Sequence, residues 1–241
     1  MEQVIKEFSK SLLEKIANQK IHIVSHYDTD GITSAAIFSK TLERLNKQFS
    51  LKIIKQLTKE EIKSFPENKI IILLDLGSSS LKELSDLNNE IFIIDHHEIE
   101  LIESKVHILN NHLFKEYENL CGAELAYLVS KSISEENKDL AHLAVLGMIG
   151  DTMEKEINKT RNKIINEANV RIKRGILIYP STRPLDKALE YSARPFIPGI
   201  TGDSKGTFEL LKEIGLERTT KNYKSLIDLD EDEMKRLVTA I

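Results

Sequence analysis

Tryptophan is absent from this chain of 241 residues, proline is scarce, and cysteine occurs once, as Cys121. A single thiol cannot form an internal disulfide, which is typical of a protein in a reducing cytoplasm. No apolar run approaches the roughly 20 residues that cross a bilayer. The N-terminus has the pattern of an amphipathic helix and not of a signal peptide. We therefore expect a cytoplasmic protein without a membrane partner.

An excess of positive charge is also missing, because 34 basic side chains face 38 acidic ones and the net charge is −4. The chain is therefore not a globally basic nucleic-acid binder, and any such contact requires a local patch. One candidate is the segment 155–187, with nine Lys or Arg residues against three Asp or Glu. Phosphate backbones bind such a patch in a salt-dependent way. A solvated helix face would have the same composition.

Apolar residues make up 41% of the chain, enough for a sizeable core. Short apolar runs predict buried strands at residues 21–25, 51–56, 70–74, 91–94 and 106–109. Helical patterns lie between and around them, at residues 2–18, 31–45, 58–61, 80–88, 121–134 and 138–149. Strands that alternate with helices predict an α/β fold, a doubly wound and mainly parallel sheet flanked by helices. We expect this domain to span residues 1–151, and residues 152–241 to form a helical and loop-rich extension of it or a linker.

Four short acidic and histidine clusters carry most of the chemical information. They are His26-Tyr-Asp28-Thr-Asp30-Gly31, Asp75, Asp95-His96-His97, and Asp151. The first three follow predicted strands directly, and the carboxyl ends of parallel strands line the crevice where such sheets bind ligands. Mixed nitrogen and oxygen donors suit manganese, zinc, cobalt or iron better than calcium. Their convergence predicts two divalent metals and a metal-dependent phosphoesterase.

Each cluster also has a structural interpretation. An Asp-x-Asp-Gly sequence is common in turns, Asp75 could cap the turn at residues 78–80, and Asp151 could simply end a helix. Two adjacent imidazoles beside a carboxylate could form a satisfied structural cluster, although such groups are costly to bury unless they are used. The joint occurrence of all four favours the metal site, because four separate structural explanations would have to hold together.

In order and approximate spacing, these motifs resemble those of the DHH phosphoesterases. That superfamily includes RecJ-type single-strand exonucleases, oligoribonucleases, cyclic-dinucleotide phosphodiesterases and one class of inorganic pyrophosphatase. The chain looks most like an archaeal RecJ-like nuclease. Further phrases support that resemblance: Asn110-Asn111-His112, Cys121-Gly122-Ala123, the segment 181–185 and the segment 198–202.

The resemblance implies a role for each residue. His26 and Asp28 would bind one metal, Asp30, His96 and Asp151 the second, and Asp75 both. The expected ions are two Mn²⁺, with Mg²⁺ or Co²⁺ as alternatives. The implied catalytic residues are Asp95, orienting a ligating imidazole, His97, contacting the scissile phosphate, and His112, a further phosphate contact. The expected substrate-binding residues are Asn110, Arg161, Arg171, Lys173, Arg174 and Arg183.

The expected function is hydrolysis of single-stranded DNA or RNA by a RecJ-like exonuclease with a two-metal mechanism. One alternative is a pyrophosphatase or small-nucleotide phosphodiesterase. Another is a non-catalytic or dual-role replication scaffold that binds the GINS complex of the replicative helicase. The complete set of expected metal-site residues favours an enzyme.

The sequence departs from the family pattern at two points. Asn111 stands where the family often has proline. A second domain with a glycine-rich motif ending in His is not evident, which suggests a truncated piece or a natural short form with weak activity of its own. Digestion polarity, DNA or RNA preference, the physiological metal and the oligomeric state are left open.

Overall fold

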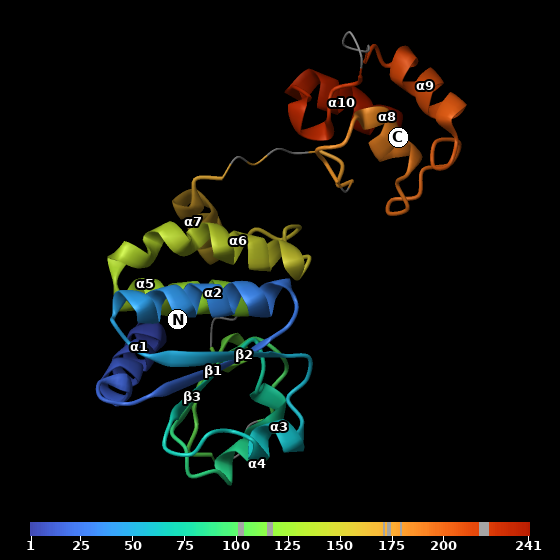
Figure 1. Cartoon of the computed structure of the whole chain (residues 1–241). Helices are drawn as coiled ribbons and strands as arrows, with labels where there is room; N and C mark the ends of the chain where they lie inside the picture. Colours follow the sequence, from blue (N-terminus) through green and yellow to red (C-terminus); the bar gives the residue numbers. More distant parts are fainter. Residues whose placement is uncertain (101–103, 115–117, 171, 173–174, 179, 217–221) are drawn as a thin grey trace. The chain divides into compact units, whose positions relative to one another are not determined.

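A computed structural model describes residues 1–100, 104–114, 118–170, 172, 175–178, 180–216 and 222–241 (Figure 1). The chain divides into two compact units, Met1–Val170 and Arg171–Ile241. Each unit has a hydrophobic core of its own. Among the described residues, no helix combines the length and apolar character needed to cross a membrane.

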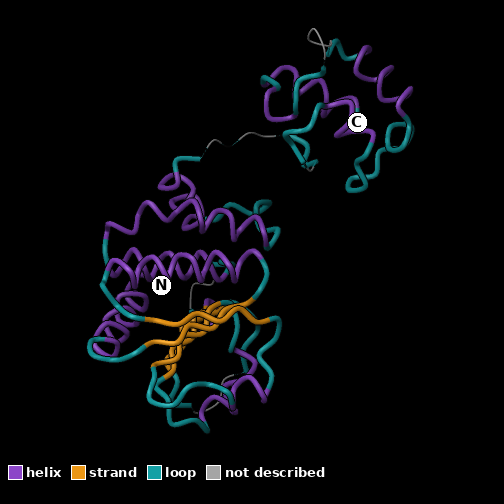
Figure 2. Tube along the Cα trace, viewed as in Figure 1, coloured by secondary structure: helices purple, strands orange, loops and turns teal. Residues whose placement is uncertain are grey.

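A five-stranded, entirely parallel sheet forms the centre of the first unit (Figure 2). Its strands are β1 (Ile21–His26), β2 (Phe49–Ile54), β3 (Ile70–Leu74), β4 (Ile91–Asp95) and β5 (His107–Asn110), in the order β2-β1-β3-β4-β5. Every residue of β3 is buried. Its run of Ile and Leu without polar alternation is what a strand covered on both faces requires. The expected doubly wound sheet is confirmed.

Helices cover both faces of this sheet. On one side lie α1 (Glu2–Ile16), α2 (Thr29–Arg44) and α5 (Gly122–Ile133), with α6 (Ala141–Gly150) and α7 (Lys159–Ala168) packed beyond them (Figure 1). On the other side lie α3 (Lys59–Lys63) and α4 (Leu81–Ser85). Short 3₁₀ turns occur at Ser78–Ser80, Asn111–Leu113 and Glu135–Leu140. The last of these precedes α6, so the helix expected over residues 138–149 begins at Ala141.

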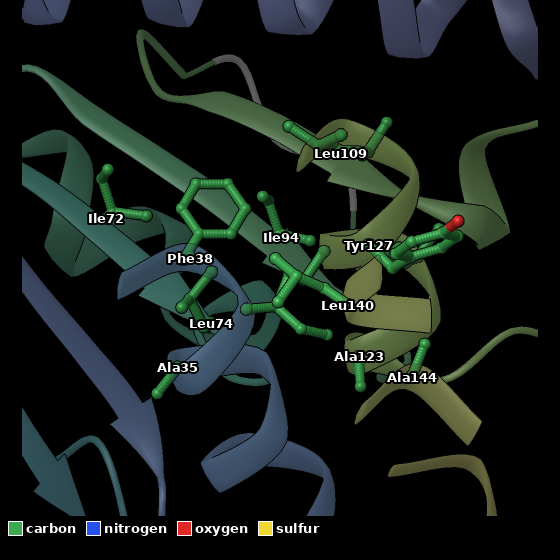
Figure 3. Close-up of a cluster of buried hydrophobic side chains, with 14 of the residues drawn as sticks. Ala35, Phe38, Ile72, Leu74, Ile94, Leu109, Ala123, Tyr127, Leu140 and Ala144 are labelled. Carbon is green, nitrogen blue, oxygen red and sulfur yellow. The ribbon is translucent and has the colours of Figure 1, made fainter. Parts of the chain in front are cut away.

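Two hydrophobic clusters follow from the alternation of side chains along the strands. Ile72 and Leu74 of β3 pack with Phe38 of α2 and Tyr127 of α5 in the larger cluster (Figure 3). The intervening residues of β3 pack against α3 and α4 on the opposite face. Full burial of each such side chain contributes about 1.5–3 kcal/mol. The sheet therefore provides a rigid frame for whatever its strand ends carry.

The second unit contains α8 (Leu185–Glu190), α9 (Ser204–Glu213), a 3₁₀ turn at Leu226–Asp228 and α10 (Glu231–Ala240). Their core includes Leu189, Leu211 and Leu237.

The compact units separate after Val170, whereas the sequence suggested a boundary at Asp151. The reason is α7, whose Ile164 and Ile165 belong to the core of the first unit.

Candidate metal centre

The acidic and histidine clusters meet at the carboxyl ends of β1, β3 and β4. β1 lies between β2 and β3, so the chain crosses to opposite sides of it, and such a switch point is where open parallel sheets bind ligands. Three groups of side chains there have donor atoms within 4.8 Å of one another. They are His26, Asp28 and Asp75; Asp30, His96 and Asp151; and Asp75, His96 and His97. All six predicted metal ligands are thus brought together.

His26 and Asp28 of the first group come from the end of β1 and the turn into α2. Asp28 is the N-cap of α2, and its Oδ1 accepts a hydrogen bond from the backbone N–H of Gly31 at 2.9 Å. Its Oδ2 lies 2.8 Å from Nδ1 of His26. A Cβ atom on Gly31 would lie 2.3 Å from the carbonyl oxygen of His26, so the turn needs glycine there. The capping geometry therefore fixes Asp28 beside His26.

Asp75 lies between two imidazoles. Its Oδ2 is 3.3 Å from Nδ1 of His26, and its Oδ1 is 3.3 Å from Nε2 of His96. The side chain is 1% exposed, and neither oxygen has a hydrogen-bond partner among the described residues. Burial and the nearby carboxylates of Asp30 and Asp28 raise the pKa of Asp75 to about 11. A buried carboxyl group with unpartnered oxygens facing two donor sets fits a shared ligand of two cations.

The second group surrounds the Nε2 atom of His96. That nitrogen is 3.2 Å from Oδ2 of Asp151 and 3.7 Å from Oδ2 of Asp30. Burial lowers the pKa of His96, although the carboxylates around it act in the opposite direction. Burial, followed by the charges of Asp30 and Asp28, raises the pKa of Asp151 to about 7. A neutral imidazole among carboxylates is a donor set for a divalent transition metal.

Asp30 is held by the N-terminus of α5. Its Oδ2 accepts from the N–H of Gly122 at 2.6 Å, and its Oδ1 accepts from the N–H of Ala123 at 2.8 Å. A Cβ on Gly122 would lie 2.8 Å from Oδ2 of Asp30 and 2.9 Å from Cβ of Asp75. A Cβ on Gly147 of α6 would lie 2.7 Å from Oδ1 of Asp30. The two glycines thus let α5 and α6 approach the carboxylates; only Gly122 had a signal in the sequence, the phrase Cys121-Gly122-Ala123.

Asp95 orients His97. Its Oδ1 is 2.7 Å from Nδ1 of His97, and its Oδ2 accepts from the N–H of Ser78 at 2.9 Å. Burial alone would raise the pKa of Asp95, but the hydrogen bonds from His97 and Ser78 outweigh it and lower that pKa. The same bond raises the pKa of the half-exposed His97.

One expectation and one structural alternative from the sequence change as a result. Asp95 was expected to orient a ligating imidazole, whereas it contacts the ring of His97, the residue expected to contact phosphate. Asp95, and not Asp75, holds the turn at Ser78. His97 could also join a metal site, because its Nδ1 is 4.0 Å from Oδ1 of Asp75. The shorter contact with Asp95 competes for that nitrogen.

Asn110 is fully buried, and its hydrogen bonds support the segment that carries His97. Its amide donates to Oγ of Ser78 and to the carbonyl of His97, both at 2.9 Å, and its Oδ1 accepts from the N–H of His112. A direct substrate contact by Asn110 is therefore contradicted, because its polar atoms are buried and used within the protein. His112 itself is exposed in the turn Asn111–Leu113.

Arg161, expected at a nucleic-acid surface, is instead buried. Its side chain is 1% exposed and forms a two-point ion pair with Glu124, at 2.8 and 2.7 Å. The prediction fails for this residue, because a buried partner 37 positions away in the chain determined its location. Arg183 is exposed in the second unit. Arg171, Lys173 and Arg174 lie outside the described residues.

Comparison with known families gives two matches. The model of the DHH family, N-terminal domain, matches residues 20–148. The model of the DHH-CID domain matches residues 178–241.

Two relatives are similar in sequence. The uncharacterized protein MJ0831 of Methanocaldococcus jannaschii is 31% identical over 98% of this chain and 57% of its own length. YorK of Bacillus subtilis, a putative prophage-derived single-strand DNA-specific exonuclease, is 31% identical over 73% of this chain and 32% of its own length. The chain thus spans about half of one relative and a third of the other.

Solved structures share the fold. The crystal structure of exonuclease RecJ bound to manganese matches 87% of this chain and 56% of that one, with a TM-score of 0.61 and 20% identity. CDC45 from Entamoeba histolytica matches 97% of this chain and 56% of that one, with a TM-score of 0.67 and 15% identity.

Proposed function

The chain belongs to the DHH family, and from this membership and the geometry of the centre we propose that it is a metal-dependent phosphodiesterase, a RecJ-like exonuclease for single-stranded DNA or RNA. The observation that carries the proposal is the position of Asp75. Its two unpartnered oxygens face one His/Asp group each, which is the arrangement that a shared ligand of two metal ions needs. Relatives described as single-strand DNA-specific exonucleases support the choice of substrate.

In this proposal His26 and Asp28 would hold one ion, Asp30, His96 and Asp151 would hold the other, and Asp75 would be a ligand of both. Mn²⁺ is the favoured ion because the donors are mixed nitrogen and oxygen, and because a fold relative is bound to manganese. Mg²⁺ and Co²⁺ are the alternatives. Two such ions, when bound, would lower the pKa of water and would stabilise the attacking and leaving oxygens of a phosphate ester.

The protein's own side chains position the phosphate. Asp95 fixes the imidazole of His97 through Nδ1 and raises its pKa, so the ring stays protonated to higher pH than a free histidine. A protonated imidazole donates a charge-assisted hydrogen bond to a phosphate oxygen. Asn110 supports the same loop through the carbonyl of His97. We assign His97 to the scissile phosphate and Asp95 and Asn110 to its orientation, with His112 as a further phosphate contact.

Hydrolysis of end-labelled single-stranded DNA and RNA of one sequence tests the proposal. Each reaction is run with Mn²⁺, Mg²⁺ or Co²⁺, and pyrophosphate is offered as a substrate in a separate reaction. We expect a ladder of products with Mn²⁺. The Asp75→Asn variant should lose this activity, and the Asp86→Asn variant, which changes an exposed carboxylate after α4, should keep it.

Two results would contradict the proposal. Cleavage of pyrophosphate without cleavage of either nucleic acid would indicate a pyrophosphatase. Metal binding without any hydrolysis would favour a replication scaffold, the alternative for which GINS is the expected partner.

A further inference from the structure

Among the described residues, exposed apolar side chains lie close to the proposed ligands in the chain or in the sheet. Tyr27 is 50% exposed, Ile32 is 50% exposed and Ile53 is 41% exposed. Tyr27 stands between His26 and Asp28 in the chain, so its backbone is fixed by two of the proposed ligands. Exposed apolar residues are ordinary when they are scattered singly, whereas a group of them at a site suggests a ligand contact.

Local structure places these residues near the carboxyl end of β1. Asp28 is the N-cap of α2, so Tyr27 and Ile32 occupy the two positions that commonly pack together around a helix N-terminus. Ile53 of β2 lies beside Ser25 of β1 in the sheet. Its neighbour Ile54 packs on the face that carries α3 and α4, so Ile53 points to the face that carries α2. We refer to Tyr27, Ile32 and Ile53 as the Tyr27 shelf.

The aromatic ring of the shelf directly adjoins the proposed ligands. The ring centroids of Tyr27 and His26 are 5.0 Å apart, and their planes meet at 89°. This edge-to-face contact is a favoured aromatic geometry, and it holds the tyrosine next to His26. Nδ1 of His26 in turn lies 2.8 Å from Asp28 and 3.3 Å from Asp75. A group covalently attached to a phosphate at the centre would therefore reach the half-exposed ring.

We propose that the Tyr27 shelf receives the base of the nucleotide whose phosphate lies at the metal centre. Every nucleobase offers a flat π face, so stacking on tyrosine tolerates all sequences while it rejects substrates without a base. Tyr27 would thus be a substrate-binding residue that favours nucleic acid over inorganic phosphates. This inference rests on the proposed function and adds the residue that selects a nucleoside.

A purely structural role for Tyr27 makes a different prediction. If the residue only packs against Ile32 to start α2, its removal lowers stability and affects all ligands of the centre alike. A base contact instead affects ligands that carry a base and leaves a sugar phosphate unchanged.

Equilibrium binding to the full chain distinguishes the two roles, with dAMP and deoxyribose 5-phosphate as probes in Mg²⁺ and ligand-observed NMR as the readout. We expect the unmodified protein to bind dAMP about fivefold or more tightly than the sugar phosphate. Tyr27→Ala should abolish this preference at unchanged affinity for deoxyribose 5-phosphate, and Tyr27→Phe should retain it. Tyr191→Ala, which removes an exposed tyrosine of the second unit, is the matched control.

Equal affinities in the unmodified protein, or equal losses for both probes in Tyr27→Ala, would overturn the inference. Should Tyr27→Ala fail to fold, Tyr27→Leu decides in the same way, because it keeps an apolar side chain before α2 and removes the aromatic ring. Base-selective binding without oligonucleotide hydrolysis would refute the exonuclease and keep the shelf. Oligonucleotide hydrolysis without base-selective binding would support the exonuclease and refute the role of the Tyr27 shelf.

Discussion

At the scale of single residues, Asp75 combines an unfavourable backbone conformation with an unfavourably buried carboxyl group. Its backbone adopts φ +57°, in the left-handed region that non-glycine residues rarely occupy. Its carboxyl group is buried, and burial together with the charges of Asp30 and Asp28 raises its pKa to about 11. Strained backbone and unpaired buried groups are typical of functional sites. We infer that the metal-free protein is destabilised here and that cations relieve this.

Replacing Asp75 by asparagine should therefore stabilise the metal-free protein. Asparagine tolerates the left-handed backbone and has nearly the same shape. Its amide is neutral without a proton, whereas the carboxyl group of Asp75 must bind a proton on folding to lie beside Asp30 and Asp28 at neutral pH. We expect the Tm in EDTA to rise by a few degrees, the shift that about 1 kcal/mol produces in a domain of this size. Added Mn²⁺ should stabilise the variant less than the unmodified chain. A lower Tm in EDTA would contradict the inference.

The raised pKa values of Asp75 and Asp151, about 11 and about 7, also predict a pH dependence. Because folding raises these pKa values, their contribution to stability is present at low pH and is lost as pH rises towards the folded-state values. The raised pKa of His97 has the same sign. Calorimetry in EDTA should give a lower Tm at pH 8.5 than at pH 6.5. Saturating Mn²⁺ should reduce the difference between the two Tm values. A metal-free Tm that rises from pH 6.5 to pH 8.5 would refute the predicted pH dependence.

At the scale of elements, the N-terminus of α5 completes the site. Two backbone N–H groups of this helix hold Asp30, and they come from residues more than 90 positions away in the chain. The positive end of the helix dipole favours a carboxylate at that position. α5 thus fixes a proposed ligand that α2 carries.

Gly122→Ala tests this arrangement. The added methyl group would lie within 3.0 Å of both Asp30 and Asp75, so the two carboxylates must separate. Overpacking of this kind costs about 1–3 kcal/mol. We also expect a loss of Mn²⁺ affinity of about tenfold or more, as when groups that support metal ligands are changed. In Gly175→Ala the three nearest atoms to the added methyl group all belong to the flexible side chain of Met234, so the affinity should be unchanged. An equal loss in both variants would contradict the role of α5.

Much of the fold was predictable at this scale, because local patterns determine it. The apolar runs that form β1 and β3 predicted the sheet, and the residues that follow them predicted the positions of His26 and Asp75. Contacts between distant segments were not predictable. Nothing local to Arg161 indicates that Glu124 would bury it, and nothing local to Asp30 indicates that α5 would hold it.

At the scale of the whole molecule, the chain consists of two units with separate cores. The ion pair between Arg161 and Glu124 attaches α7 to the first unit. Arg161 also donates to the carbonyls of Asn119 and Met153. This network explains why the first unit continues to Val170.

Arg161→Met should destabilise the first unit by about 3–5 kcal/mol, because Glu124 would keep a buried charge without a partner. Chemical denaturation measures this loss. The double variant Arg161→Met, Glu124→Gln should recover much of it, since no unpaired charge remains. If the single variant unfolds like the unmodified chain but binds single-stranded DNA more weakly, Arg161 has the surface role that the sequence suggested.

The number of Mn²⁺ ions bound per chain tests the central claim most directly, namely that the four clusters form one two-metal centre shared through Asp75. Isothermal titration calorimetry, combined with elemental analysis of the dialysed protein, gives this number. We predict two ions for the unmodified chain and fewer than two for Asp75→Asn, with the remaining binding weakened. A single ion in the unmodified chain, or two ions bound equally well by Asp75→Asn, would contradict the account.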